Sequence, residues 1–375
     1  MSGPSHAVES NETNVSGGAG TSRWSILVYA PSWIGDAVMS LGALRYLRHA
    51  YPDSQLTVLA KPGIEDLYRC CEAVDGTMCL DPGTERGVSG FLRVASRLRE
   101  SAFDLAVLFP NSFRSAATVW AAGIPHRWGY GHDGRGFLLT KAAPPAHRPF
   151  GRHQAYFYID LLRHLGIETG EPDLRLNLQE SMRRNAATLL EAHGWRSGES
   201  LIGIHPGATG SAAKRWMPKR YAEVADRLAA SAASHDARVV ILGGAGEEAI
   251  AAETKAHLRS APIILAGKTS LAELMGIAAT LSVLICNDSG PMHVASALGV
   301  PTVAVFGPTD ERETGPLGRD ARVVRQQVEC SPCLLKDCPI DHRCMDRVTV
   351  ENVYQVAVDL LNGKGSRQRA EATLR

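Results

Sequence analysis

Apolar segments of strand length alternate with amphipathic segments of helix length along most of the chain, and this alternation constrains the fold more than any other feature. Alternation of this kind predicts parallel sheets covered by helices on both faces. The chain has 375 residues, which is long for one core, so we expect two doubly wound α/β domains. The strand-like segments are 24–29, 55–60, 103–109, 201–206, 237–244, 262–267, 281–287 and 301–307.

The composition along the chain predicts where these domains begin and end. Residues 1–23 are rich in Ser, Gly and Asn and lack the apolar core of a signal peptide, so we expect a disordered tail. The first domain is expected at 24–178 and the second at 195–347, with a hinge near 177–200. An amphipathic helix is expected to follow at 348–363.

Charge and hydropathy exclude several classes of function. Lys and Arg number 40 against 39 Asp and Glu, so no basic field would attract nucleic acid, and we expect no nucleic-acid partner. The sequence contains no run of 18 or more apolar residues, so we expect no membrane-spanning helix. The scattered cysteines fit a reducing compartment, so we expect a cytoplasmic protein.

Asp36 lies in the stretch PSWIGDAVMS, between a predicted strand and a predicted helix. Ligands of open α/β sheets bind at this carboxyl edge of the strands. Asp is also a favoured helix N-cap, so the residues leave two interpretations, a cap or a catalytic carboxylate.

The stretch from Asn287 to Asp310 predicts a helix whose start suits an anion. Asp288 or Ser289 can cap it, and Gly290 permits close approach to free backbone N–H groups. The alternative is an ordinary capped helix between two strands.

Two more loops leave predicted strands of the second domain. The loop from His205 is rich in Gly, Ala and Ser and leads to Lys214, which could supply charge to a phosphate. A solvated basic face is the alternative for Lys214 and its basic neighbours. In the loop 242–249, Glu247 or Glu248 could accept hydrogen bonds from a ribose, or could be a first-turn acid of a helix.

These loops converge on one nucleotide-sized region that faces Asp36 across a predicted interdomain cleft. A phosphate cradle opposite a carboxylate suits group transfer from an activated nucleotide, with the carboxylate deprotonating an acceptor hydroxyl. The chain contains no D-x-D motif for a divalent metal, so leaving-group charge would fall to Lys214 and the helix start at 288–290.

Three segments, 31–48, 205–228 and 287–309, together resemble the ADP-heptose:lipopolysaccharide heptosyltransferases of glycosyltransferase family 9, most closely the heptosyltransferase II group. The resemblance covers about Trp24 to Gly363. It implies a GT-B glycosyltransferase fold of two Rossmann-like domains, with acceptor on the first and ADP-heptose on the second. It also implies inverting transfer that requires no metal or other cofactor.

The resemblance implies roles for individual residues. Asp36 would be the general base, and Lys214 would contact the diphosphate and sugar, with Thr209 in the loop before it. Glu247, or Glu248 if the alignment slips by one, would bind the ribose. The donor motif would comprise Asp288, Ser289, Gly290 and His293, with Asp288 facing heptose hydroxyls.

The resemblance also implies features outside the donor site. The helix 348–363 could cross back to the first domain. Basic residues of the first domain, namely Arg114, Arg135 and Lys141, could meet acceptor phosphates or carboxylates. The implied acceptor is the heptose- and Kdo-bearing inner core of lipopolysaccharide, reached by peripheral contact with the cytoplasmic face of the inner membrane.

Other functions stay open at this stage. The acceptor could be a protein, as for the related autotransporter heptosyltransferases. The chain could also use another nucleotide sugar, or bind one without turnover, although a binding module has no need of Asp36.

A cysteine cluster with C-x2-C-x4-C-x5-C spacing occupies 330–344. Four thiolates at this spacing could hold a structural zinc or iron ion. Free thiols and disulfides are the alternatives. The four residues are Cys330, Cys333, Cys338 and Cys344.

Overall fold

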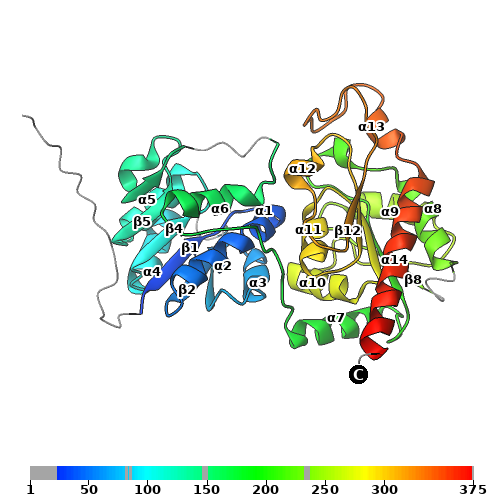
Figure 1. The fold of residues 1–375 in the computed structure, drawn as a ribbon, viewed down its shortest axis with the longest axis horizontal. Helices are drawn as coiled ribbons and strands as arrows, with labels where there is room; N and C mark the ends of the chain where they lie inside the picture. The colour runs from blue at the N-terminus through cyan, green and yellow to red at the C-terminus, as the bar shows by residue number, and fades with distance from the viewer. Residues whose placement is uncertain (1–22, 81–82, 84–86, 146–150, 232–236, 374–375) are drawn as a thin grey trace, which may run out of the picture.

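The computed structural model describes residues 23–80, 83, 87–145, 151–231 and 237–373, with side chains as far as 363. It contains two six-stranded parallel sheets, each in its own domain (Figure 1). The predicted α/β fold with two doubly wound sheets is therefore confirmed. All of the expected tail at 1–23 except Arg23 lies outside the described residues.

The first sheet has the strand order β3-β2-β1-β4-β5-β6. Its order reverses beside β1, which pairs with β2 on one side and β4 on the other. A crevice forms at the carboxyl ends of strands at such a reversal. The strands are β1 (Ser25–Tyr29), β2 (Gln55–Ala60), β3 (Gly76–Cys79), β4 (Leu105–Leu108), β5 (His126–Tyr130) and β6 (Lys141–Ala143).

Helices cover both faces of this sheet because successive strand residues point to opposite sides. Ile26 and Val28 pack with one set of helices, and Leu27 packs with the other. The first set is α1 (Ile34–Met39), α2 (Leu41–Ala50), α3 (Ile64–Arg69) and α6 (Ala155–His164), and the second is α4 (Gly87–Glu100) and α5 (Phe113–Ala121). A 3₁₀ helix, η1 (Arg135–Leu138), packs against α5.

The second sheet has the order β12-β11-β10-β7-β8-β9 and reverses between β7 and β10. Its strands are β7 (Leu201–His205), β8 (Arg238–Ile241), β9 (Ile263–Ile264), β10 (Val283–Asn287), β11 (Thr302–Val305) and β12 (Ala321–Val324). Its flanking elements are α7 (Glu180–Ala192), η2 (Ala212–Lys214), α8 (Pro218–Ala229), α9 (Glu248–His257), α10 (Leu271–Thr280), α11 (Gly290–Ala297), α12 (Glu311–Thr314), α13 (Arg343–Asp346) and α14 (Val350–Thr373).

The expected return of the helix at 348–363 to the first domain is wrong. This helix, α14, packs against α8 and against β10, β11 and β12 of its own domain (Figure 1). Its apolar residues Val353, Ala357 and Leu360 are buried in the core of the second domain, because only that sheet offers their stripe an apolar face.

The connection between the domains runs along their junction before α7 packs against α10. The Leu176 N–H donates to the Ala297 carbonyl of the second domain, and the Asn177 N–H donates to the Cys70 carbonyl of the first. Within the described part of the chain, no helix combines the length and apolar character needed to cross a bilayer.

Candidate functional site

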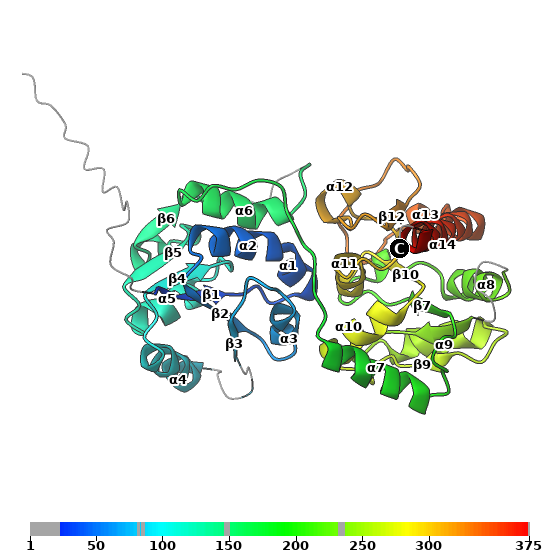
Figure 2. The ribbon, with the colours of Figure 1, turned by 60° about the horizontal axis from the view of Figure 1, so that its bottom comes forward.

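The helices that follow the two reversal strands meet at the domain junction. α1 leaves β1, α11 leaves β10, and Figure 2 shows the two helices facing each other between the domains. Glycines allow this approach: a Cβ atom at Gly290 would lie 3.0 Å from Ile34 Cβ, and one at Gly35 would lie 3.1 Å from His293 Cδ2. The contact places the start of α1 directly against the start of α11.

Asp36 lies in the first turn of α1 and is 8% exposed. Trp33 is the N-cap of this helix, so the interpretation of Asp36 as a cap is wrong. Asp36 instead lines a hollow of about 410 Å³ at the carboxyl edge of the first sheet, which we call the Asp36 hollow. Other residues of this hollow include Ser32, Phe109, Asn111, His132 and Tyr158.

Lys214 and Asp288 form an ion pair on the facing domain. Lys214 Nζ lies 2.7 Å from Asp288 Oδ2, and Asp288 is only 4% exposed. Thr314 Oγ1 donates a longer bond, 3.4 Å, to the same carboxylate oxygen. Lys214 is therefore directed into the site, rather than lying on the solvated basic face that was the alternative.

Glu247 is buried and held by three groups from neighbouring loops. Its Oε2 accepts from the Gly244 N–H at 2.8 Å and from His205 Nε2 at 3.1 Å, while Thr209 Oγ1 donates to Oε1 at 3.4 Å. Burial alone would raise the pKa of Glu247, but the bond and charge of His205 and the Gly244 amide outweigh it and lower the pKa. Glu248, by contrast, is exposed.

His205 connects Glu247 to the start of α11. Since a carboxylate only accepts, Nε2 donates to Glu247, while Nδ1 lies 3.3 Å from Ser289 Oγ, whose hydroxyl also donates to the Asn287 carbonyl at 3.2 Å. The sequence analysis did not assign His205 a role. The signal was present, because it is the one polar residue of the otherwise apolar strand β7 and ends that strand at the predicted edge.

Asn287 was also missed, and it joins two of the predicted loops. Its Nδ2 donates to the carbonyls of Pro206 and Gly207, and its Oδ1 accepts from the Trp216 N–H and the Tyr221 hydroxyl. Asn287 is fully buried, so this set of bonds fixes the β7 loop relative to α11.

The start of α11 combines a cap with a buried imidazole. Ser289 is the N-cap, and Gly290 and Pro291 open the helix. His293 is 5% exposed, and burial lowers its pKa to about 4 although Asp288 opposes the shift. The ring is therefore neutral near pH 7 and packs against Gly35 of the first domain.

The cysteine loop supports the segment that precedes Lys214. The Ala213 N–H and Ser211 Oγ both donate to the Lys336 carbonyl, at 2.9 and 3.2 Å, and His342 Nε2 donates to the Ala213 carbonyl at 2.6 Å. The loop thus positions η2, which carries Lys214.

The cysteine loop brings Cys330, Cys333 and Cys338 near Cys344. Among the described residues, no three His, Cys, Asp or Glu side chains are grouped as ligands of a metal ion. Burial raises the pKa of the Cys344 thiol, and the nearby Cys330, Cys333 and Cys338 raise it further. The predicted zinc or iron stays a prediction.

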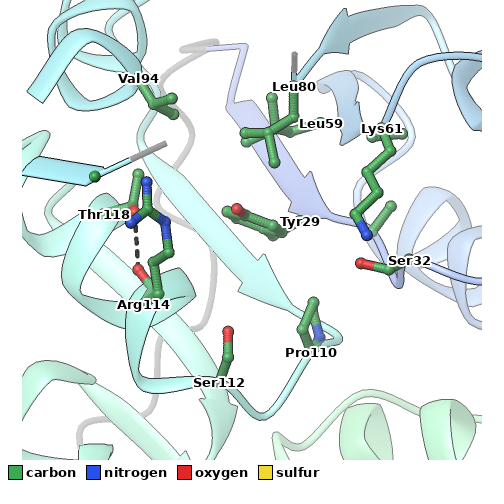
Figure 3. A pocket seen from close by; sticks show the side chains of 13 residues that line it. Tyr29, Ser32, Leu59, Lys61, Leu80, Val94, Pro110, Ser112, Arg114 and Thr118 are labelled. Atoms are coloured by element: carbon green, nitrogen blue, oxygen red, sulfur yellow. Dashed lines mark hydrogen bonds between the residues drawn. The ribbon is translucent and has the colours of Figure 1, made fainter. Parts of the chain in front are cut away.

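Two of the three cations expected to meet the acceptor have structural roles instead. Arg135 is fully buried and donates to the carbonyls of Tyr130 and Pro110, so it is not available to a ligand. Lys141 donates to the Leu165 carbonyl and lies over the Trp128 ring. The third, Arg114, lines a hollow of the first domain (Figure 3).

Two Rossmann-like domains therefore face each other, with a carboxylate at the edge of one sheet and, at the edge of the other, a helix start beside the Lys214–Asp288 ion pair. This is the GT-B fold of nucleotide-sugar glycosyltransferases, and the chain is an enzyme of this class.

Comparison with known proteins identifies the family. The model of glycosyltransferase family 9 (heptosyltransferase) matches residues 91–343. Lipopolysaccharide heptosyltransferase 2 of Escherichia coli (strain K12) is 34% identical over 321 residues, covering 80% of this chain and 87% of that protein. The chain belongs to glycosyltransferase family 9, the heptosyltransferases.

Solved structures of heptosyltransferases share the fold. The structure of E. coli ADP-heptose lps heptosyltransferase II has a TM-score of 0.76 and 29% identity, covering 91% of this chain and 99% of that one. E. coli heptosyltransferase WaaC with ADP has a TM-score of 0.67 and 17% identity, covering 90% of this chain and 99% of that one, which shows the fold alone.

Proposed function

We propose that this protein transfers L-glycero-D-manno-heptose from ADP-heptose to the heptose/Kdo inner core of lipopolysaccharide, as a heptosyltransferase II. The names of its similar relatives support this activity, among them the E. coli lipopolysaccharide heptosyltransferase 2. The structural observation that supports the proposal is the contact between α1 and α11, in which Gly35, the residue before Asp36, packs against His293 of the second domain.

Asp36 is the general base of the proposed reaction. Its carboxylate takes the proton of the acceptor hydroxyl while that oxygen forms a bond to the anomeric carbon of heptose. The bond from this carbon to the β-phosphate oxygen breaks on the opposite face, so the configuration inverts and ADP leaves.

The charge that develops on ADP is met by groups of the second domain. Lys214 and the free N–H groups at the start of α11 face the diphosphate, so no divalent metal is required. In this proposal Lys214 turns from Asp288 to the phosphates when donor binds, which leaves Asp288 to accept hydrogen bonds from heptose hydroxyls.

The remaining donor contacts follow from the same edge of the sheet. Glu247 binds the ribose with the oxygen that Thr209 contacts, since the other oxygen is occupied by His205 and Gly244. The sugar and the phosphates of the bound donor lie against Ser289, Gly290 and His293.

Peripheral contact with the inner membrane at its cytoplasmic face is part of the proposal. Trp33, Phe113 and Phe137 are 67%, 49% and 75% exposed on the first domain. Trp33 and Phe113 directly follow Ser32 and Ser112, which line the Asp36 hollow, and the Phe137 ring lies 6.2 Å from that of Phe113. Exposed aromatic side chains favour the boundary of a bilayer, where the lipid-anchored acceptor lies.

The test is transfer from ADP-heptose to Kdo-lipid A that carries one heptose, with EDTA present. The parent protein is expected to transfer heptose, and Asp36→Asn is expected to lose about 10²- to 10⁴-fold in kcat with unchanged ADP-heptose affinity. Glu65→Gln, at a first-turn acid of α3, is the matched control. Substantial activity of Asp36→Asn would contradict the role of base, and transfer to a protein acceptor instead would contradict the acceptor.

A further inference from the structure

The start of α6 in the first domain faces α12 of the second domain and is bonded to it (Figure 1). The Gln154 N–H donates to the Glu313 carbonyl at 2.9 Å, and the Gly151 N–H donates to the Glu313 carboxylate at 2.8 Å. His153 Nε2 lies 2.8 Å from the Gly315 carbonyl. These three bonds cross from one domain to the other, and we call them the α6–α12 junction.

His153 acts as a donor in this junction. Its Nδ1 accepts from the N–H of Ala155, the first residue of α6, at 3.1 Å. Nδ1 therefore carries no proton, and the proton on Nε2 is donated to the Gly315 carbonyl. The side chain is 7% exposed and burial lowers the pKa of the ring, so it is neutral near pH 7. One imidazole thus binds the first N–H of α6 and joins this helix to the second domain.

The acceptors of the junction flank a residue that contacts the donor site. Thr314 lies between Glu313 and Gly315, and its Oγ1 is 3.4 Å from Asp288 Oδ2. Asp310 caps α12, and its carbonyl accepts from the Thr314 N–H at 3.2 Å. The junction therefore ends on a short, internally bonded segment that contacts the carboxylate we assign to the heptose hydroxyls.

On the first domain, the same end of α6 reaches the Asp36 hollow. Phe157 and Tyr158 lie about one helical turn after His153, and both line that hollow together with Asp36. α6 also contacts α1, the helix that carries Asp36. Few residues therefore separate the wall of the Asp36 hollow from the donor wall across the junction.

We propose that His153 is a positioning residue of the transfer reaction. Its bond to the Gly315 carbonyl fixes α6, and with it the wall of the Asp36 hollow, relative to Asp288. The acceptor hydroxyl and the anomeric carbon are then held in reacting geometry by the two domains, which is how orientation contributes to rate. His153 itself touches neither substrate. The inference rests on the proposed function, because the step that His153 serves is that transfer.

Two variants separate the junction from the contact within α6. The amide of asparagine reaches about as far as Nδ1, so His153→Asn can still accept from Ala155 but does not reach Gly315. The amide of glutamine reaches about as far as Nε2, so His153→Gln can still donate to Gly315. We expect kcat to fall about tenfold in His153→Asn and to stay near the parent's value in His153→Gln. The KM for ADP-heptose should stay unchanged in both, because the donor wall lies on the second domain.

His164→Asn, at an exposed histidine in the last turn of α6, is the matched control and is expected to leave kcat unchanged. Three results would overturn the inference while the proposed function stands. The first is an unchanged kcat in His153→Asn, and the second is a loss in His153→Gln that equals or exceeds it. The third is a raised KM for ADP-heptose in place of the lower kcat.

Hydrogen exchange read by mass spectrometry tests the junction without turnover. With ADP present, the amides of residues 151–155 should exchange about tenfold faster in His153→Asn than in the parent protein or His153→Gln, because the neighbouring bonds to Glu313 lose their support. Equal exchange in all three proteins would overturn the inference even where heptose is transferred. The expected pattern in a protein that transfers no heptose would support the junction and contradict the proposed function.

Discussion

The two walls of the site are built differently. On the second domain, Lys214, Asp288, His205, Glu247 and Asn287 are joined to one another or to the backbone by hydrogen bonds, and four of the five are nearly fully buried. On the first domain, the comparable edge consists of two adjoining hollows. Asp36 lines one of them, and Lys61 and Arg114 line the other.

The difference follows the proposed ligands. A nucleotide sugar is small and doubly charged, so side chains that are already fixed by hydrogen bonds can stabilise it with little reorganisation beyond the turn of Lys214. The acceptor is larger, and open hollows lined by apolar surface and by cationic side chains accommodate it. We call the second-domain side of the site the ordered wall. The predictions below change this wall and its contact with the first domain.

Among the predictions that follow, Lys214→Met is expected to have the largest effect. It removes the charge that faces the diphosphate and leaves the buried Asp288 carboxylate unpaired. We expect kcat/KM to fall about 10²- to 10³-fold, as for loss of one charge-stabilising group, together with weaker binding of ADP. Steady-state kinetics and calorimetric titration with ADP measure both effects. Lys219→Met, an exposed lysine in the first turn of α8, is the control, and an equal loss there would contradict the role of Lys214.

Gly290→Ala tests the contact between the walls. The added methyl group would lie 3.0 Å from Ile34 Cβ, so α1 has to move away from α11. We expect kcat to fall about tenfold while ADP affinity changes little, because a misplacement of the base affects only the chemical step. Ile34→Gly, which removes the obstructing Cβ together with the rest of the side chain, should restore part of kcat in the double variant. No loss of kcat in Gly290→Ala would show that the contact does not position Asp36.

Much of the fold could be predicted from the sequence because buried parallel strands are continuous apolar runs. β1, β2, β4, β7, β8, β10 and β11 all coincide with predicted segments, and even the two-residue β9 lies within one. β3, β6 and β12 were not predicted, since they are edge strands of three or four residues, and β5 was not predicted because it begins with the polar His126 and Arg127. An edge strand buries too few side chains to require a continuous apolar run in the sequence.

The residues of the site could be predicted where the local sequence alone determines their position in the fold. The order strand, loop, helix placed Asp36, Lys214 and Asp288 at the sheet edges without knowledge of tertiary contacts. The partner of Lys214 could not be read from the sequence, because 74 residues separate it from Asp288. For the same reason Arg135 was misassigned: its burial depends on carbonyls that only the folded chain assembles.

The neutral state of His293 is a consequence of the ordered wall and makes stability depend on pH. Burial lowers the pKa of His293 to about 4, from an ordinary value of 6.5. Between these values the unfolded chain binds a proton that the folded protein does not, so stability is present above pH 6.5 and is lost as the pH falls toward 4. The loss between pH 7 and pH 5 should be about 2 kcal/mol of unfolding free energy.

Urea unfolding of the parent protein and of His293→Gln at both pH values checks this dependence. The parent should lose about 2 kcal/mol more than the variant on acidification, because other titrating groups are common to both. Equal losses would show that His293 is protonated in the folded protein, and that α1 does not exclude water from its ring.

His205→Gln should have the smallest effect, and it probes how the ordered wall is arranged. The imidazole donates to Glu247 with one nitrogen and contacts Ser289 Oγ with the other, whereas a glutamine amide cannot meet both partners at the same positions. We expect the KM for ADP-heptose to rise about threefold to tenfold with kcat unchanged, the value of one neutral hydrogen bond. His257→Gln, an exposed histidine of α9, is the control. Because the two residues share this bond, Ser289→Ala should add little to His205→Gln, and full additivity of the two changes would show that His205 does not act through Ser289.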